Sequence, residues 1–288
     1  MEPERIAARL WPERVRGIEA LGGGITNHNF VVSLDDGTRL VLRIGGKDTS
    51  LLGIDRDVEH SATAAAADAG VAPRAVAFVD GYLVTEFVEG HAEPELRGRL
   101  AEVARLLRRF HDARPIPGRF DAFRVVERYA ATAAAHGVAP PAAYDEAKAL
   151  AHRIEALREG VASGPCHNDL LNANFIDDGE RLWIVDWEYA GMGDRFFDLA
   201  NFSINHELDD AANAALLGAY FGELRDADLA ALRLMRFMSD FREAMWGVVQ
   251  QAISELEFDF VRYADDHFAR LERTAADPAF LAALEGPA

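Results

Sequence analysis

In the first third of the chain, apolar and polar positions alternate over short runs, a spacing of two that is typical of half-buried β-strands. Turn residues separate the runs, notably the Asp-Asp-Gly of residues 35–37 and the Asp-Gly of residues 80–81. Because short turns join neighbouring strands antiparallel, we expect a small five-stranded antiparallel sheet. The strands that this pattern predicts are residues 15–21, 30–34, 38–44, 75–79 and 82–88.

In the remainder of the chain the apolar positions recur every three or four residues, which indicates amphipathic helices. Residues 54–69, an Ala-rich stretch that ends before Gly70, form the one helix predicted among the strands. The change of spacing predicts an α+β protein of two parts, residues 1–88 and residues 89–288, with a hinge at Glu89 and Gly90. The helices predicted after the hinge are residues 95–110, 121–135, 144–157, 211–224, 226–254 and 256–274.

Composition narrows the class of protein. The chain has 288 residues, half of them hydrophobic, so it can bury a sizeable core and is not expected to be disordered. Its single Cys excludes an intramolecular disulfide and a Cys-based zinc site. A formal net charge of −18 disfavours nucleic acid and anionic lipid, and we find neither a signal-peptide core nor an apolar run long enough to span a membrane. We therefore expect a cytoplasmic protein that binds no nucleic acid and does not insert into membranes.

One stretch of the helical part concentrates polar residues between apolar flanks. Asp169 is followed five positions later by Asn174, and Asp186 ends the next apolar run. This is the spacing of a kinase catalytic loop, in which an Asp takes the proton of the attacking hydroxyl while an Asn and a second Asp hold Mg²⁺ against the phosphates. We interpret Asp169 as the base and Asn174 and Asp186 as the metal ligands. The plainer alternative is a capping turn followed by an unrelated carboxylate at a strand end.

Three charged residues in apolar surroundings extend this interpretation. Arg43 lies between apolar residues of a predicted strand, where it is either exposed or available to pair with phosphate. Glu59 lies in the helix that follows, where kinases keep the partner of their strand cation. Asp198 lies among aromatic and aliphatic residues, and a carboxylate buried among apolar residues needs a hydrogen-bond donor or a positive charge beside it. We expect Asp198 to accept hydrogen bonds from backbone N–H groups of the loop around Asp169, with an ordinary helix cap as the alternative.

Five stretches of the chain carry a resemblance to a known family: residues 22–30, 42–44, 166–174, 184–189 and 246–258. They are similar to motifs of the choline/ethanolamine kinases, within the aminoglycoside-phosphotransferase-like kinases. The match spans most of the chain. The stretch that begins at Trp246, with Tyr263 beyond it, resembles the choline-site region of that family and not the aminoglycoside kinases.

The resemblance implies a protein-kinase-like bilobal fold, with a small antiparallel-sheet N-terminal lobe that binds nucleotide and a larger helical lobe that holds the catalytic loop and the acceptor site. It also implies ATP and Mg²⁺ as cofactors and transfer of the γ-phosphoryl group to the hydroxyl of choline or ethanolamine. By position, the ATP-binding residues would be Thr26, Asn27, Asn29, Arg43 and Glu59. The acceptor-binding residues would be Glu188, Tyr189, Trp246 and Tyr263, and His167 and Asp198 would support the loop.

Two alternatives stay open at this point. Another cationic alcohol, such as an aminoglycoside or thiamine, would be attracted equally by the net negative charge, although aromatic residues such as Trp246 suit a compact ammonium better than a polyamino sugar. A non-catalytic nucleotide-binding scaffold is the second alternative. The loss of Asp169, Asn174 or Asp186 would have indicated it, and all three residues are present.

Overall fold

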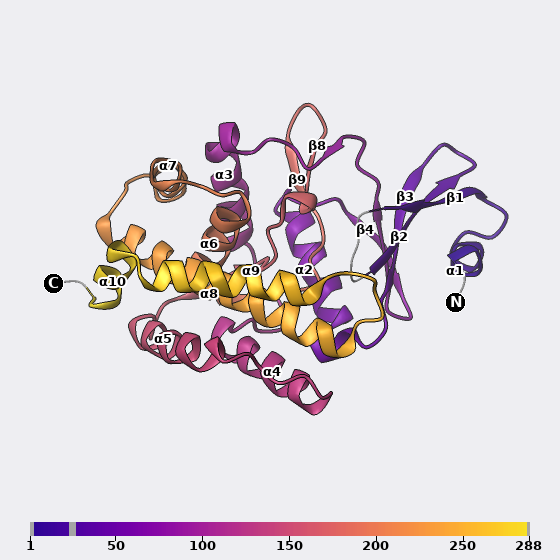
Figure 1. Cartoon of the computed structure of the whole chain (residues 1–288). Helices are drawn as coiled ribbons and strands as arrows, with labels where there is room; N and C mark the ends of the chain where they lie inside the picture. The colour runs from indigo at the N-terminus through magenta and orange to yellow at the C-terminus, as the bar shows by residue number, and fades with distance from the viewer. Residues whose placement is uncertain (1–2, 23–26, 287–288) are drawn as a thin grey trace.

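The computed structural model describes residues 3–22 and 27–286, with an antiparallel sheet at one end and a helical region at the other (Figure 1). The sheet has five strands in the order β1-β2-β3-β5-β4, and every neighbouring pair is antiparallel. This confirms the predicted sheet, although β2 begins at Asn27 and β5 ends at Glu86, short of the predicted end at residue 88. The strands are β1 (Val15–Leu21), β2 (Asn27–Leu34), β3 (Arg39–Gly45), β4 (Ala75–Val79) and β5 (Tyr82–Glu86).

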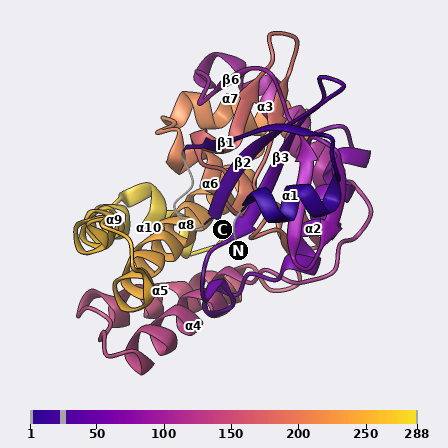
Figure 2. The same cartoon turned by 90° about the vertical axis from the view of Figure 1, so that its right-hand side faces the viewer.

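A helix that was not predicted, α1 (Pro3–Leu10), covers one face of this sheet, as the view onto the sheet in Figure 2 shows. Ile6 and Ala7 of α1 are buried in one small hydrophobic core with inward side chains of the sheet, among them Val32 and Leu42. Its apolar residues do lie on one side of the helix, but a segment of eight residues spans only about two turns, which is short for recognition from sequence. Its burial comes from contact with the strands, which only the fold reveals.

The helix α2 (Arg56–Asp68) connects β3 to β4, yet it packs with the helical region. Asp55 caps its first turn by accepting hydrogen bonds from the backbone N–H groups of Asp57 and Val58. The small side chains on its buried face, including Ala62 and Ala66, belong to the larger hydrophobic core that also contains residues of the helical region. Hydrophobic packing therefore crosses the sequence boundary at residue 88.

The helical region is arranged around α8 (Asp226–Ile253), against which α4, α6 and α9 pack. Figure 1 shows α8 and α9 side by side along the molecule. The C-terminal half of α8 is buried on nearly all sides because other elements surround it. The remaining helices are α3 (Leu100–His111), α4 (Ala122–Ala135), α5 (Ala143–Leu157), α6 (Arg195–Asn205), α7 (Asp210–Phe221), α9 (Phe260–Ala275) and α10 (Pro278–Leu284).

The predicted helices are all present, with shifted ends. The helix predicted from residue 95 begins at Leu100, after a single 3₁₀ turn, and the one predicted from residue 256 begins at Phe260, where Asp259 caps it. The last helix, α10, was not predicted, because its seven residues are too few for a clear period. Over residues 3–22 and 27–286, no helix is both long enough and apolar enough to cross a bilayer.

Two small sheets carry the loops of the polar motif. β7 (Ser163–Cys166) pairs with β10 (Gly191–Asp194), and β8 (Phe175–Asp177) lies between β6 (His91–Ala92) and β9 (Leu182–Ile184). The connection from β7 to β8 contains Asp169 and Asn174, and Asp186 follows β9. The fold thus brings the two halves of the motif to neighbouring loop positions.

Candidate active site

The loop after β7 is held by a buried carboxylate from α6. Asp198 accepts hydrogen bonds from the backbone N–H groups of His167 and Asn168, both at 2.7 Å, and lies 3.0 Å from Nε2 of His111. The contacts with the loop are those that the sequence predicted for Asp198. Asn168 has a left-handed φ of 67°, which costs free energy in a residue other than glycine and requires support from its surroundings. Asp198 supplies that support.

His167 ties this loop to the segment that carries Asp186. Its Nε2 lies 3.0 Å from the backbone oxygen of Val185, and its Nδ1 accepts a hydrogen bond from the backbone N–H of Asp169 at 3.2 Å. One ring nitrogen donates and the other accepts, which is the pattern of a neutral imidazole. Burial lowers the pKa of His167 and so favours the same neutral form.

Asn174 and Asp186 present hard oxygen atoms to one cavity. Nδ2 of Asn174 donates to the backbone oxygen of Asp169 at 2.7 Å, so its amide oxygen is the atom left to hold a metal. Asp186 has a left-handed φ of 67°, and its Oδ1 lies 2.5 Å from Nη1 of Arg43. Carboxylate and amide oxygens are ligands that Mg²⁺ accepts in proteins. The donor set therefore fits a magnesium ion.

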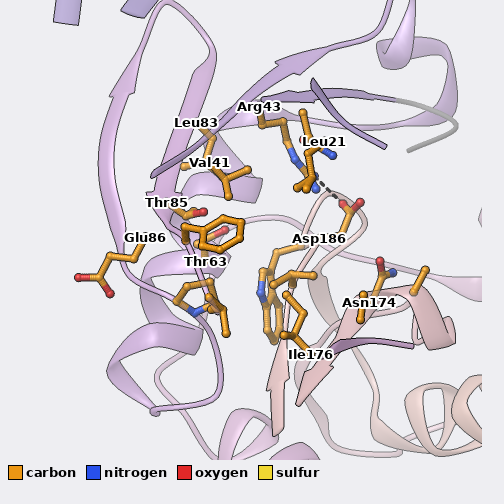
Figure 3. Close-up of a pocket in the computed structure, with 18 of the residues that line it drawn as sticks. Leu21, Val41, Arg43, Thr63, Leu83, Thr85, Glu86, Asn174, Ile176 and Asp186 are labelled. Carbon is orange, nitrogen blue, oxygen red and sulfur yellow. Dashed lines mark hydrogen bonds and ion pairs between the residues drawn. The ribbon is translucent and has the colours of Figure 1, made fainter. Parts of the chain in front are cut away.

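Arg43 on β3 links the sheet to this site. Its Nη1 pairs with Oε1 of Glu59 on α2 at 2.8 Å as well as with Asp186, and Figure 3 shows the contact with Asp186. Burial works against the charge of Arg43, but the carboxylates of Asp186 and Glu59 raise its pKa well above the usual value. The guanidinium is therefore charged at every accessible pH and can meet phosphate oxygens.

A cavity of about 270 Å³ lies between the sheet and the helical region (Figure 3). Val41 and Leu83 line it from the sheet, and Ile176 and Val185 line it from the β8 and β9 side. Its polar lining includes Asn29, Arg43, Asn174 and Asp186. Apolar walls with a few converging polar groups are typical of a site for a small ligand such as a nucleotide.

Asn27 and Glu188 meet in a neighbouring network. Asn27 donates to Oε2 of Glu188 at 2.8 Å, and Arg56 of α2 donates to both residues, at 2.9 Å to Asn27 and 3.2 Å to Glu188. Burial, together with the charge of Asp186, raises the pKa of Glu188 to about 8. The sequence analysis did not select Arg56, and the signal available was its position three residues before Glu59, with which it pairs. Thr26, predicted with these residues, lies outside the described part of the chain.

The other three predicted acceptor residues contact one another. The indole N–H of Trp246 donates to Oη of Tyr189 at 3.2 Å, and the rings of Trp246 and Tyr263 meet edge to face with centres 5.5 Å apart. Trp246 also meets Phe260 edge to face at 5.7 Å. The structure thus brings together residues that are far apart in the sequence, on α8, α9 and the segment after β9.

Two residues that the sequence analysis missed, Arg242 and Glu243, join this aromatic cluster to Asp169. Nη1 of Arg242 lies 3.0 Å from Oδ1 of Asp169 and 2.5 Å from Oε1 of Glu243, and its guanidinium carbon lies 4.4 Å from the centre of the Tyr189 ring. Tyr263 donates its hydroxyl to Oε2 of Glu243 at 2.8 Å. The available signal was a pair of charges inside a long apolar helix, where a buried charge needs a partner.

These contacts set the ionisation of the two carboxylates. Burial raises the pKa of Asp169 to about 7, even though Arg242 works in the opposite direction. Burial would also raise the pKa of Glu243, but Arg242, His267 and Tyr263 outweigh it and hold that pKa below its usual range. Near neutral pH, Glu243 is therefore ionised and Asp169 is poised between its two states.

Comparison with known proteins identifies the family. Residues 17–235 match the phosphotransferase enzyme family. A choline/ethanolamine kinase family protein from Mesorhizobium loti is 31% identical, with a TM-score of 0.83 over 98% of this chain and 96% of that protein. Protein LicA of Haemophilus influenzae is 26% identical over 268 residues, 87% of this chain and 78% of LicA. Ethanolamine kinase 2 of Mus musculus is 27% identical over 290 residues, 88% of this chain and 74% of the mouse protein.

The fold and the site define a kinase-like phosphotransferase for small molecules. The chain belongs to the phosphotransferase enzyme family and, within it, to the choline/ethanolamine kinase family. The family and the kinase-like α+β fold that the sequence motifs implied are thereby confirmed.

Proposed function

We propose that the protein transfers the γ-phosphoryl group of ATP to the hydroxyl group of choline or ethanolamine. The observation that carries this proposal is that Arg43, Asn174 and Asp186 line one cavity. Asp169 lies beside it, where its backbone oxygen accepts a hydrogen bond from Asn174. The relatives named as choline/ethanolamine or ethanolamine kinases support the choice of acceptor.

In the proposed reaction the hydroxyl oxygen of the acceptor attacks the γ-phosphorus and forms the new P–O bond. The hydroxyl proton passes to the carboxylate of Asp169. The bond between the γ-phosphorus and the β–γ bridging oxygen breaks, and ADP leaves with its electron pair. A base with a pKa of about 7 suits this step, because it is substantially ionised at neutral pH and still accepts a proton readily. Arg43, held by Glu59, would pair with phosphate oxygens.

Mg²⁺ is the metal that this site would hold, through the amide oxygen of Asn174 and the carboxylate of Asp186. When bound, the ion neutralises charge on the β and γ phosphates and orients them. Among the other residues predicted to contact the nucleotide, Asn29 lines the cavity. Asn27 is hydrogen-bonded to Glu188 and Arg56 instead. We also propose a cytoplasmic location, where ATP is available, and a division into a nucleotide-binding lobe, residues 1–88, and a catalytic lobe, residues 89–288. The position of the five-stranded sheet, within residues 15–86, supports this division.

The acceptor side favours a compact cation over a polyamino sugar. Tyr189, Trp246 and Tyr263 form one contact cluster with the ionised carboxylate of Glu243, and Arg242 joins this cluster to Asp169. Aromatic rings with one carboxylate suit a single ammonium group, whereas an aminoglycoside calls for a wide cleft with several carboxylates.

The test is the release of ADP from ATP and Mg²⁺ in the presence of choline, ethanolamine, thiamine or an aminoglycoside. We expect turnover with choline, ethanolamine or both, and turnover slower by about 10²-fold or more with the same mixture when Asp169→Asn replaces the wild type. Turnover with thiamine or the aminoglycoside alone would assign a different acceptor. If none of the four compounds supports ATP consumption, the proposed function is wrong.

A further inference from the structure

When Asp169 is ionised, as the base must be, the buried contact between Asp169, Arg242 and Glu243 holds two negative charges and one positive charge. A single guanidinium nitrogen of Arg242 serves both carboxylates, at 3.0 Å and 2.5 Å. Arg242 and Glu243 are 1% and 3% exposed, so water can do little to compensate the surplus charge. A ligand that brings one positive charge to this point would balance the cluster.

Arg242 already lies over the ring of Tyr189, one of the aromatic residues that a quaternary ammonium could contact. Its guanidinium carbon lies 4.4 Å from the centre of the Tyr189 ring. Because Arg242 is a buried residue of α8, it cannot turn to solvent without opening the core. Its Nε and Nη2 atoms are buried without a hydrogen-bond partner among the described residues, which indicates that a ligand oxygen, such as the acceptor hydroxyl, completes the site.

The remaining rings of the aromatic cluster are engaged with one another. Trp246 is 7% exposed, donates its indole N–H to Tyr189 and meets Tyr263 and Phe260 edge to face. The group beside these rings that can accept hydrogen bonds from a cation is the carboxylate of Glu243. Each of its oxygens uses one lone pair, toward Arg242 or Tyr263, and can accept a second hydrogen bond.

We propose that Glu243 recognises a primary ammonium group, and that the protein therefore prefers ethanolamine and related primary amino alcohols to choline. This inference rests on the proposed function and narrows its acceptor. A primary ammonium offers three N–H donors, while a trimethylammonium offers none. Since one nitrogen of Arg242 contacts both carboxylates, a two-carbon amino alcohol can place its hydroxyl on Asp169 and its ammonium on Glu243.

The first test needs only the wild-type protein with ATP and Mg²⁺. We expect kcat/KM to fall stepwise along ethanolamine, N-methylethanolamine, N,N-dimethylethanolamine and choline, by about tenfold or more in total, as N–H donors to a charged acceptor are lost. An equal or higher kcat/KM for choline would overturn this inference and leave the proposed function standing. Failure to phosphorylate any of the four would instead remove the proposed function, and this inference with it.

The second test separates recognition from folding. Glu243→Gln keeps the shape and removes the charge, and Glu272→Gln removes the same charge from an exposed position on α9 as a control. We expect Glu243→Gln to raise the ethanolamine KM enough to lower the ratio of kcat/KM for ethanolamine to that for choline about fivefold or more. The control should keep the wild-type ratio. An unchanged ratio in Glu243→Gln, with both acceptors weakened alike, would show a merely structural role and overturn the inference.

Discussion

The phosphoryl-transfer side and the acceptor side of this site are built in different ways. Asp169, Asn174 and Asp186 lie on loops, and Asp186 and the loop residue Asn168 have left-handed backbones held by neighbouring contacts. Trp246 and Glu243 lie on a helix that is buried along its C-terminal half. Substitutions on the loop side should therefore change activity with little effect on stability, while those on the helix side should change both.

Asp169→Asn should produce the largest loss of activity on the loop side. A base acts in the transition state, so we expect kcat to fall about 10²- to 10⁴-fold while ATP affinity stays close to that of the wild type. Steady-state kinetics and nucleotide titration measure the two effects. Activity within a few-fold of the wild type would remove Asp169 as the base.

Asp186→Ala should cost slightly less in kcat but should also weaken nucleotide binding. A metal that stabilises the transition state contributes several kcal/mol, which corresponds to about 10²- to 10³-fold in rate. Raising the Mg²⁺ concentration should restore only part of the activity. Because Glu59 still pairs with Arg43, the thermal midpoint should change little. Full activity of this variant without Mg²⁺ would contradict the metal assignment.

The loop side was also the part that could be predicted from sequence. Asp169 and Asn174 are five positions apart, and such local spacing is fixed by the turn itself, whatever the rest of the fold does. Arg242 and Glu243 could not be assigned, because their partners Asp169 and Tyr263 are brought to them by packing between distant elements.

The same distinction holds for the fold. Strands and helices with several periods were predicted with small errors at their ends, since each carries its own apolar pattern. The short elements α1, α10, β6, β7 and β10 were missed, because tertiary contacts stabilise them more than their own sequences do. The buried network of Asn27, Arg56 and Glu188 was missed for the same reason, since it joins three separate segments.

The pH dependence of activity should report the ionisation of Asp169, the loop residue that contacts Arg242 on the helix side. The pKa of Asp169 is raised to about 7 by burial, so the ionised base is lost as the pH falls through that value. We expect kcat/KM to decline about tenfold per pH unit below about pH 7 and to level off above it. The residual activity of Asp169→Asn should lack this decline. A wild-type profile that is flat between pH 5 and pH 8 would contradict the assignment.

Trp246→Ala should show the behaviour of the helix side. Truncation of a buried aromatic residue costs about 3–5 kcal/mol of stability, so the thermal midpoint should fall clearly. Activity should decline for ethanolamine and choline alike, since both rely on the same packed cluster. A stable variant that has lost only choline turnover would instead assign the indole to cation binding.

Trp246→Phe should have the smallest effect, and it distinguishes the indole ring from its N–H group. Phenylalanine keeps an aromatic ring against Tyr263 and Phe260 but removes the hydrogen bond to Tyr189. A neutral hydrogen bond contributes about 1 kcal/mol, so we expect a small drop in unfolding free energy, measured by denaturant titration.

If the ammonium binds Glu243, the KM values for ethanolamine and choline should each stay within about threefold of the wild type. If the indole face holds the cation, the choline KM should rise well beyond that limit, because the phenyl ring binds cations more weakly than the indole does. That result would place acceptor recognition on the aromatic rings and remove Glu243 from its proposed role.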